Sequence, residues 1–102
     1  MTNQEISSLL ESAGSSVYVD ACEWPYGRMM MCHMVGDRVE DLHAMADKIG
    51  VDRRWFQNTR YPHYDICKSK RALAVKFGAK EIDRRKFVEI AHRLMRRSVP
   101  EL

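Results

Sequence analysis

The residues best suited to chemistry lie between positions 53 and 71. A basic aromatic run, Arg53-Arg54-Trp55-Phe56, precedes His63-Tyr64-Asp65, and further cations follow at Lys70 and Arg71. Arginine grips phosphate through a planar fork, lysine supplies a point charge, and an aromatic ring can stack on a base. The histidine and the carboxylate add a titratable pair. This segment therefore predicts a site for an anionic ligand.

The first interpretation of the segment is recognition without catalysis. The ligand would be a nucleotide, a cyclic oligonucleotide or a nucleic-acid strand, held by the following cations and rings: Arg53, Arg54, Trp55, Phe56, His63, Lys70 and Arg71. Adjacent residues of a helical turn cannot face the same way, so we expect one of the two rings to be buried and the other to lie nearer the surface. No glycine-rich phosphate loop is present, which argues against a P-loop or a dinucleotide site.

The second interpretation is a metal-dependent phosphoester hydrolase. Imidazole and carboxylate groups bind divalent metals, and a bound metal activates water. Asp20 ends one expected strand, while His33 and Asp37 lie in or just after the next, so these side chains could meet at one end of a sheet. His63 and Asp65 could join them, and they are the candidate catalytic residues. No H-E-x-x-H motif accompanies them, so each histidine also has a structural interpretation.

The third interpretation is a protein-binding module that forms a homodimer. Methionine is dense around the second expected strand, at positions 29–31 and 34. Methionine suits adaptable interfaces, although a core strand would also explain it. An amphipathic N-terminal arm and a basic last helix would both suit association of two copies.

Length and composition set the scale of the answer. A chain of 102 residues forms one domain with a modest core, and 45% hydrophobic with 30% charged residues is typical of a globular protein. No apolar run approaches the roughly 18 residues that a membrane span requires, so we expect a cytoplasmic protein without a membrane partner. Cys22, Cys32 and Cys67 have no C-x-x-C spacing, which favours free thiols.

Charge is distributed unevenly along the chain. Residues 1–52 carry three Lys or Arg against nine Asp or Glu, a net −6, whereas residues 53–102 carry fourteen against five, a net +9. Such asymmetry indicates an anionic partner, either a small molecule or a nucleic acid. Neutralisation of one half by the other across the fold is the alternative explanation.

Strand-like and helix-like segments alternate in the first half of the chain. We predict an amphipathic arm over residues 1–15 and a single α/β domain over residues 16–102. Strands are expected at Val17–Val19 and at residues 29–35, with a turn-rich loop over residues 22–28 between them.

A helix is expected next, between Asp37 and Gly50. Asp37 and Glu40 fit a capping box, and glycine is suited to the C-terminal end. The spacing predicts four buried positions in this helix: Leu42, Met45, Ala46 and Ile49. After it, Asp52 is expected to cap a short turn that runs through Phe56.

The second half of the chain continues the alternation. Tyr64–Cys67 is expected to be extended, a helix is expected from Ser69 to Gly78, and a short strand over residues 79–82. Asp83 should cap a last helix. Its inward face is expected to carry Phe87, Ile90, Ala91 and Leu94, and its outward face Arg85, Glu89, His92 and Arg96. The sequence thus predicts a small α/β domain with a short mixed sheet packed against helices.

An ordered series of short motifs resembles a known family of small bacterial and phage proteins, domain of unknown function 4031. The series comprises Val17-Tyr18-Val19-Asp20, the Trp24 loop, Cys32-His33-Met34 leading to Asp37, Glu40-Asp41-Leu42-His43-Ala44, Arg54-Trp55-Phe56-Gln57, His63-Tyr64-Asp65 and residues 74–79. The resemblance covers about residues 17–87. It implies a compact cytoplasmic protein and, by analogy, an accessory phage role, without implying a particular activity.

Overall fold

The longest strand, β3 (Met29–Gly36), organises a five-stranded mixed sheet in the computed structural model, which describes residues 16–21 and 23–98. β1 (Val17–Val19) and β2 (Trp24–Tyr26) pair antiparallel with its two halves, while β4 (Tyr64–Cys67) pairs antiparallel along its other edge. β5 (Lys80–Glu81) is parallel to β1. The small α/β domain with a mixed sheet is therefore confirmed. The predicted arm over residues 1–15 lies outside the described residues.

Strand β2 corrects the prediction of a loop between the first two strands. Trp24 pairs with Met31 and Tyr26 with Met29 across a tight turn, where Gly27 has a φ of 59°. Pro25 cannot donate a ladder hydrogen bond, and proline is tolerated where a strand lies at the edge of a sheet. The prediction was wrong because proline and glycine here mark an edge hairpin rather than an irregular segment.

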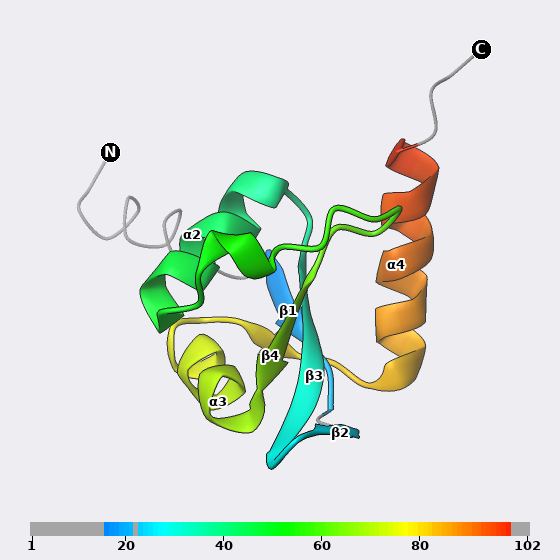
Figure 1. Cartoon of the computed structure of the whole chain (residues 1–102). Helices are drawn as coiled ribbons and strands as arrows, with labels where there is room; N and C mark the ends of the chain where they lie inside the picture. Colours follow the sequence, from blue (N-terminus) through cyan, green and yellow to red (C-terminus); the bar gives the residue numbers. More distant parts are fainter. Residues whose placement is uncertain (1–15, 22, 99–102) are drawn as a thin grey trace, which may run out of the picture.

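Helices cover the two faces of the sheet unequally. α2 (Val39–Ile49) and α3 (Lys68–Lys76) lie on one face, and α4 (Arg84–Ser98) lies on the other (Figure 1). The larger core lies between the sheet and the first two helices and includes the buried Met34 and Tyr64. A smaller core forms under α4. Among the described residues, none of the helices is long and apolar enough to cross a membrane.

The predicted helix α2 is confirmed, but its predicted capping box is wrong. All four expected positions are buried: Leu42, Met45, Ala46 and Ile49. Gly50 closes the helix in the left-handed conformation at φ 76°. The N-cap residue is Arg38, which makes no side-chain capping bond. Asp37, the expected cap, contacts Tyr18 and Arg93.

The short turn and the last helix form as expected. The 3-10 turn η1 (Arg53–Trp55) is capped by Asp52, whose Oδ1 accepts a 2.9 Å hydrogen bond from the Arg54 backbone N–H. Asp83 Oδ1 accepts from the Lys86 N–H at 2.8 Å and so caps α4. Three of the predicted inward positions of α4, namely Ile90, Ala91 and Leu94, are buried, and Phe87 packs at their edge.

Candidate functional site

One face of the sheet is only partly covered by α4. Cross-strand partners point to the same face, so Trp24, Met31 and Cys67 form one row, and His33 and Asp65 form the next. Phe87 of α4 stacks on His33, with ring centroids 4.5 Å apart. The part of the face nearest the β2–β3 turn is left open, and a pocket forms there.

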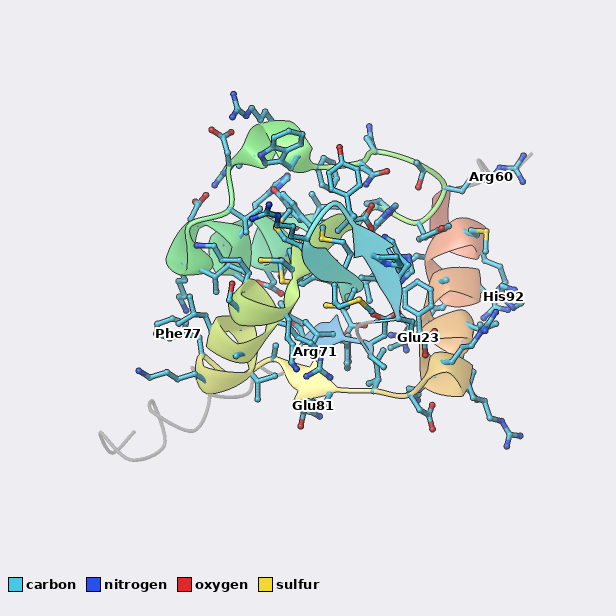
Figure 2. All side chains as sticks on the ribbon, turned by 60° about the horizontal axis from the view of Figure 1, so that its bottom comes forward. Glu23, Arg60, Arg71, Phe77, Glu81 and His92 are labelled. Atoms are coloured by element: carbon cyan, nitrogen blue, oxygen red, sulfur yellow. The ribbon has the colours of Figure 1, made fainter. Side chains whose placement is uncertain are left out.

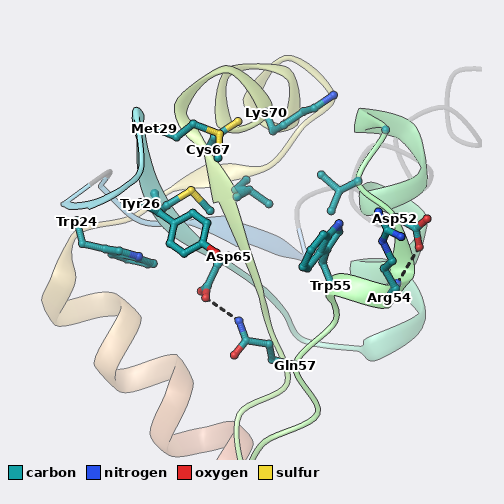
Figure 3. A pocket seen from close by; sticks show the side chains of 14 residues that line it. Trp24, Tyr26, Met29, Asp52, Arg54, Trp55, Gln57, Asp65, Cys67 and Lys70 are labelled. Atoms are coloured by element: carbon teal, nitrogen blue, oxygen red, sulfur yellow. Dashed lines mark hydrogen bonds between the residues drawn. The ribbon is translucent and has the colours of Figure 1, made fainter.

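The pocket has a volume of about 630 Å³ and extends around β4 to η1 and the start of α3. Met31 and Cys67, which are paired across β3 and β4, are among its lining residues. Tyr26 and Trp55 lie on opposite sides of it, with Cys67 and Lys70 toward one end and Asp65 and Gln57 toward the other (Figure 3). The pocket thus combines aromatic side walls with ends of different polarity.

The two large aromatic side chains beside this pocket are well exposed. Tyr26 is 69% exposed and Trp55 is 59% exposed, and the Arg54 guanidinium lies 5.1 Å from the Trp55 ring centroid. Phe56 instead packs inward, with its ring centroid 4.6 Å from that of His43 and 5.5 Å from that of Tyr64. The two rings of the Trp55-Phe56 pair face different ways as predicted, but the inner ring, Phe56, is half-buried rather than fully buried.

Only some of the predicted cations lie at the pocket. Arg54 and Lys70 line it. Arg53 instead contacts Asp47 through its guanidinium at 2.9 Å. Arg71 lies beside Glu81 in Figure 2 and donates to its carboxylate at 2.8 Å and to the Asp20 backbone carbonyl at 2.6 Å. The structure therefore separates the predicted cation set into pocket residues and residues engaged elsewhere.

Two of the proposed metal ligands, Asp20 and His33, contact each other on the α4 side of the sheet. His33 Nδ1 lies 2.7 Å from Asp20 Oδ2, and the His33 backbone N–H donates to Asp20 Oδ1 at 2.6 Å. The His33 ring lies 4.4 Å from the Trp24 ring and stacks on Phe87. One ring nitrogen and both carboxylate oxygens are thus already engaged in holding β1 to β3.

His63 and Asp65 form a second pair next to the first, since the His33 and His63 ring centroids are 5.6 Å apart. His63 is buried, and its Nδ1 lies 2.9 Å from the Tyr61 carbonyl oxygen. Its Nε2 lies 3.5 Å from Asp65 Oδ1. Asp65 Oδ2 accepts a 2.6 Å hydrogen bond from Gln57 Nε2 and faces the pocket end, so this carboxylate connects the pocket to the buried histidine.

Asp37 is held apart from the other proposed metal ligands. Asp37 accepts from the Tyr18 hydroxyl at 3.0 Å and pairs with Arg93, away from Asp20 and His33. Within residues 16–21 and 23–98, no group of three or more His, Cys, Asp or Glu side chains is placed to hold a metal ion. Asp20, His33, His63 and Asp65 form two neighbouring polar pairs on the α4 side of the sheet.

Cys67 adds a reactive group that sequence analysis did not assign to the site. It is the N-cap residue of α3, and its Sγ lies 3.3 Å from the Ser69 hydroxyl. The Ser69 hydroxyl, helped by backbone N–H groups at the start of α3, lowers the pKa of this thiol, while partial burial acts against the shift. The lining of the pocket therefore carries a thiol that ionises more readily than usual.

Sequence analysis did not assign several pocket residues to the site, because the pairing of the strands is what brings them there. Trp24 and Tyr26 reach the pocket only because β2 pairs with β3, and Gln57 because it meets Asp65 across the loop that ends at the Gln57–His63 bridge. The sequence indicated this pairing only through Trp24-Pro25-Tyr26, a short segment that lies two residues before the next strand and could form a hairpin with it.

The part of the chain that matches a known family model nearly coincides with the folded domain. Residues 17–94 match the model of a family described as Protein of unknown function (DUF4031). The chain belongs to this family. Comparison with curated proteins and with solved structures found no significant match. The match covers the sheet and most of α4, so the pocket residues fall within the family domain.

Proposed function

We propose that the pocket binds a nucleotide, with its base stacked on Trp55 and its phosphate directed toward Lys70 and Arg54. The supporting observation is the exposure of Trp55 and Tyr26 on opposite sides of a pocket of about 630 Å³ that also contains two cations. Contact with a ligand would remove apolar surface of both rings from water, which is favourable. A planar ligand between the rings buries both.

The size of the expected contribution is adequate for a useful affinity. Stacking of a base on an aromatic ring contributes about 1–3 kcal/mol, and every 1.4 kcal/mol corresponds to about a tenfold change in affinity. Two rings and one phosphate contact would therefore give binding that calorimetry can measure. The Arg54 guanidinium lies 5.1 Å from the Trp55 ring centroid, so a cation is held beside the stacking ring where it can meet a phosphate.

The first test is isothermal titration calorimetry of the full chain with AMP, adenosine and a short single-stranded oligonucleotide. We expect AMP to bind more tightly than adenosine because Lys70 and Arg54 interact with phosphate. A marked preference for the oligonucleotide would assign the same pocket to a nucleic-acid strand.

The variant Trp55→Ala should weaken AMP binding by about tenfold or more, because the stacking surface is lost. The matched control is Phe77→Ala, which removes an exposed ring just after α3 and outside the pocket lining (Figure 2). Equal affinities of the wild type and Trp55→Ala would contradict the proposal.

The variant Lys70→Met, which keeps the apolar stem and removes the charge, should reduce the preference for AMP over adenosine. The Lys70 side chain is half-buried at the pocket, so the methionine stem can occupy the same path. A preserved AMP to adenosine ratio would show that Lys70 is not the phosphate contact.

Homodimer formation, a cytoplasmic location and an accessory phage role stay predictions. Homodimer formation is checked by light scattering of the full chain.

A further inference from the structure

The two carboxylates that line the pocket have different roles. Asp52 uses its Oδ1 to cap η1. Asp65 lies at the pocket end with its side chain 31% exposed, between a buried histidine on one side and the open space on the other. The pocket therefore has a carboxylate, Asp65, at one end and a cation, Lys70, at the other.

Asp65 has fewer hydrogen bonds than an ionised carboxylate can accept. A carboxylate offers about four acceptor positions. Its Oδ2 receives the Gln57 amide, whereas Oδ1 is buried and receives no hydrogen bond from the described residues. Oδ2 holds one hydrogen bond and can accept a second from a ligand that brings an N–H group to this end of the pocket.

His63 does not supply the missing donor in its neutral form. The Tyr61 carbonyl oxygen can only accept, so the hydrogen bond at 2.9 Å places the proton of neutral His63 on Nδ1. Nε2, 3.5 Å from Asp65 Oδ1, then presents a lone pair to the carboxylate. Because Oδ1 is buried against His63 while the side chain as a whole is 31% exposed, a ligand in the pocket would donate to Oδ2.

We propose that the pocket selects a base that carries an exocyclic amino group, and that Asp65 accepts a hydrogen bond from this group. This inference rests on the proposed nucleotide-binding function. Adenine, guanine and cytosine present such N–H donors, whereas a base edge with a carbonyl oxygen at this place would be repelled by the carboxylate. Gln57 is a positioning residue, since its amide holds Asp65 through the 2.6 Å bond.

The test compares nucleotides that differ by the amino group alone. Calorimetry would measure AMP against purine riboside 5′-monophosphate, which lacks the 6-amino group, and GMP against inosine 5′-monophosphate, which lacks the 2-amino group. In at least one pair we expect the amino-bearing nucleotide to bind about tenfold more tightly or better, because it donates to a charged acceptor.

Two variants assign the preference to Asp65. Asp65→Asn keeps the shape of the side chain and removes its charge, so the affinity ratio within the responsive pair should fall toward one. Asp47→Asn is the matched control, because it makes the same change at an exposed carboxylate outside the pocket lining and should leave the ratio unchanged. A melting curve of each variant checks that it is folded.

The outcomes separate this inference from the proposed function. Equal affinities within both pairs, with clear binding of all four nucleotides, would overturn amino-group selection and leave nucleotide binding intact. Binding of none of them would overturn both. A preference that persists in Asp65→Asn would also overturn the inference, because another group would then read the base.

Discussion

At the scale of single residues, Cys67 shows how position changes chemistry. The same residue type at Cys32 is buried in the apolar core, whereas Cys67 begins a helix and faces the pocket. Donors at the start of α3 favour the thiolate, which is the nucleophilic form of cysteine. Cys67 should therefore be the more reactive of these two thiols.

The higher reactivity of Cys67 is checked by alkylation with iodoacetamide over a range of pH. Peptide-resolved mass spectrometry then gives the rate at each cysteine. The rate at Cys67 should reach half its maximum below the ordinary cysteine pKa of about 8.5, and Ser69→Ala should move the midpoint upward because the first cause of the lowered pKa is removed. Cys32 is the internal control and should react only after unfolding. A midpoint for Cys67 at or above the ordinary value would contradict the assignment.

At the scale of elements, the C-terminal end of α2 forms part of the pocket boundary. Gly50 ends α2 at φ 76° and lines the pocket, and a Cβ built there would lie 3.3 Å from Lys70 Nζ. The left-handed conformation costs other residues roughly 1–2 kcal/mol, and asparagine less than most. The glycine therefore allows α2 to turn into the loop that carries Asp52 and η1.

Gly50→Ala should lower the free energy of unfolding by about 1 kcal/mol or more, and Gly50→Asn by less, because asparagine tolerates the left-handed conformation. Urea denaturation followed by circular dichroism measures both. Equal destabilisation by the two substitutions would show that contact with Lys70, and not backbone conformation, sets the cost.

At the scale of the whole molecule, the acidic and basic halves of the sequence meet in part. Arg93 pairs with Asp37, and Arg53 pairs with Asp47, so some of the opposite charge is neutralised across the fold. Arg54 and Lys70 are left at the pocket. Charge asymmetry thus contributes both to internal pairing and to the candidate site.

The response of the whole fold to alkaline pH follows from two tyrosines. Burial raises the pKa of Tyr64 and of Tyr18, and for Tyr18 the hydrogen bond to Asp37 adds to the shift. Near pH 10, where an unfolded tyrosine ionises, the folded state therefore holds more protons than the unfolded state. Stability contributed by these groups is present below about pH 10 and is lost as the pH rises through the folded-state pKa.

Urea denaturation at a series of pH values above 9 should show a falling free energy of unfolding, and Tyr18→Phe should make the decline shallower because one raised pKa is removed. Tyr61→Phe is the control, since Tyr61 is a half-buried tyrosine in the same small core. An unchanged slope in Tyr18→Phe would contradict a role for its ionisation.

The sequence by itself determined most of the elements and the faces that they bury. The period of apolar residues predicted the four buried positions of α2, and Asp52 and Asp83 predicted two caps that form. These features depend on residues a few positions apart, so local spacing is enough to predict them. The strand over Tyr64–Cys67 was predicted for the same reason.

Only the tertiary structure decided which of the candidate residues share a site. Asp37 was assigned to a helix cap and a metal site, but Tyr18 and Arg93 approach it from distant parts of the chain. The pocket likewise requires β2 to pair with β3 so that Tyr26 lies opposite Trp55. Strand pairing and side-chain partners depend on contacts between residues far apart in sequence, and a periodic pattern within one segment carries no information about them.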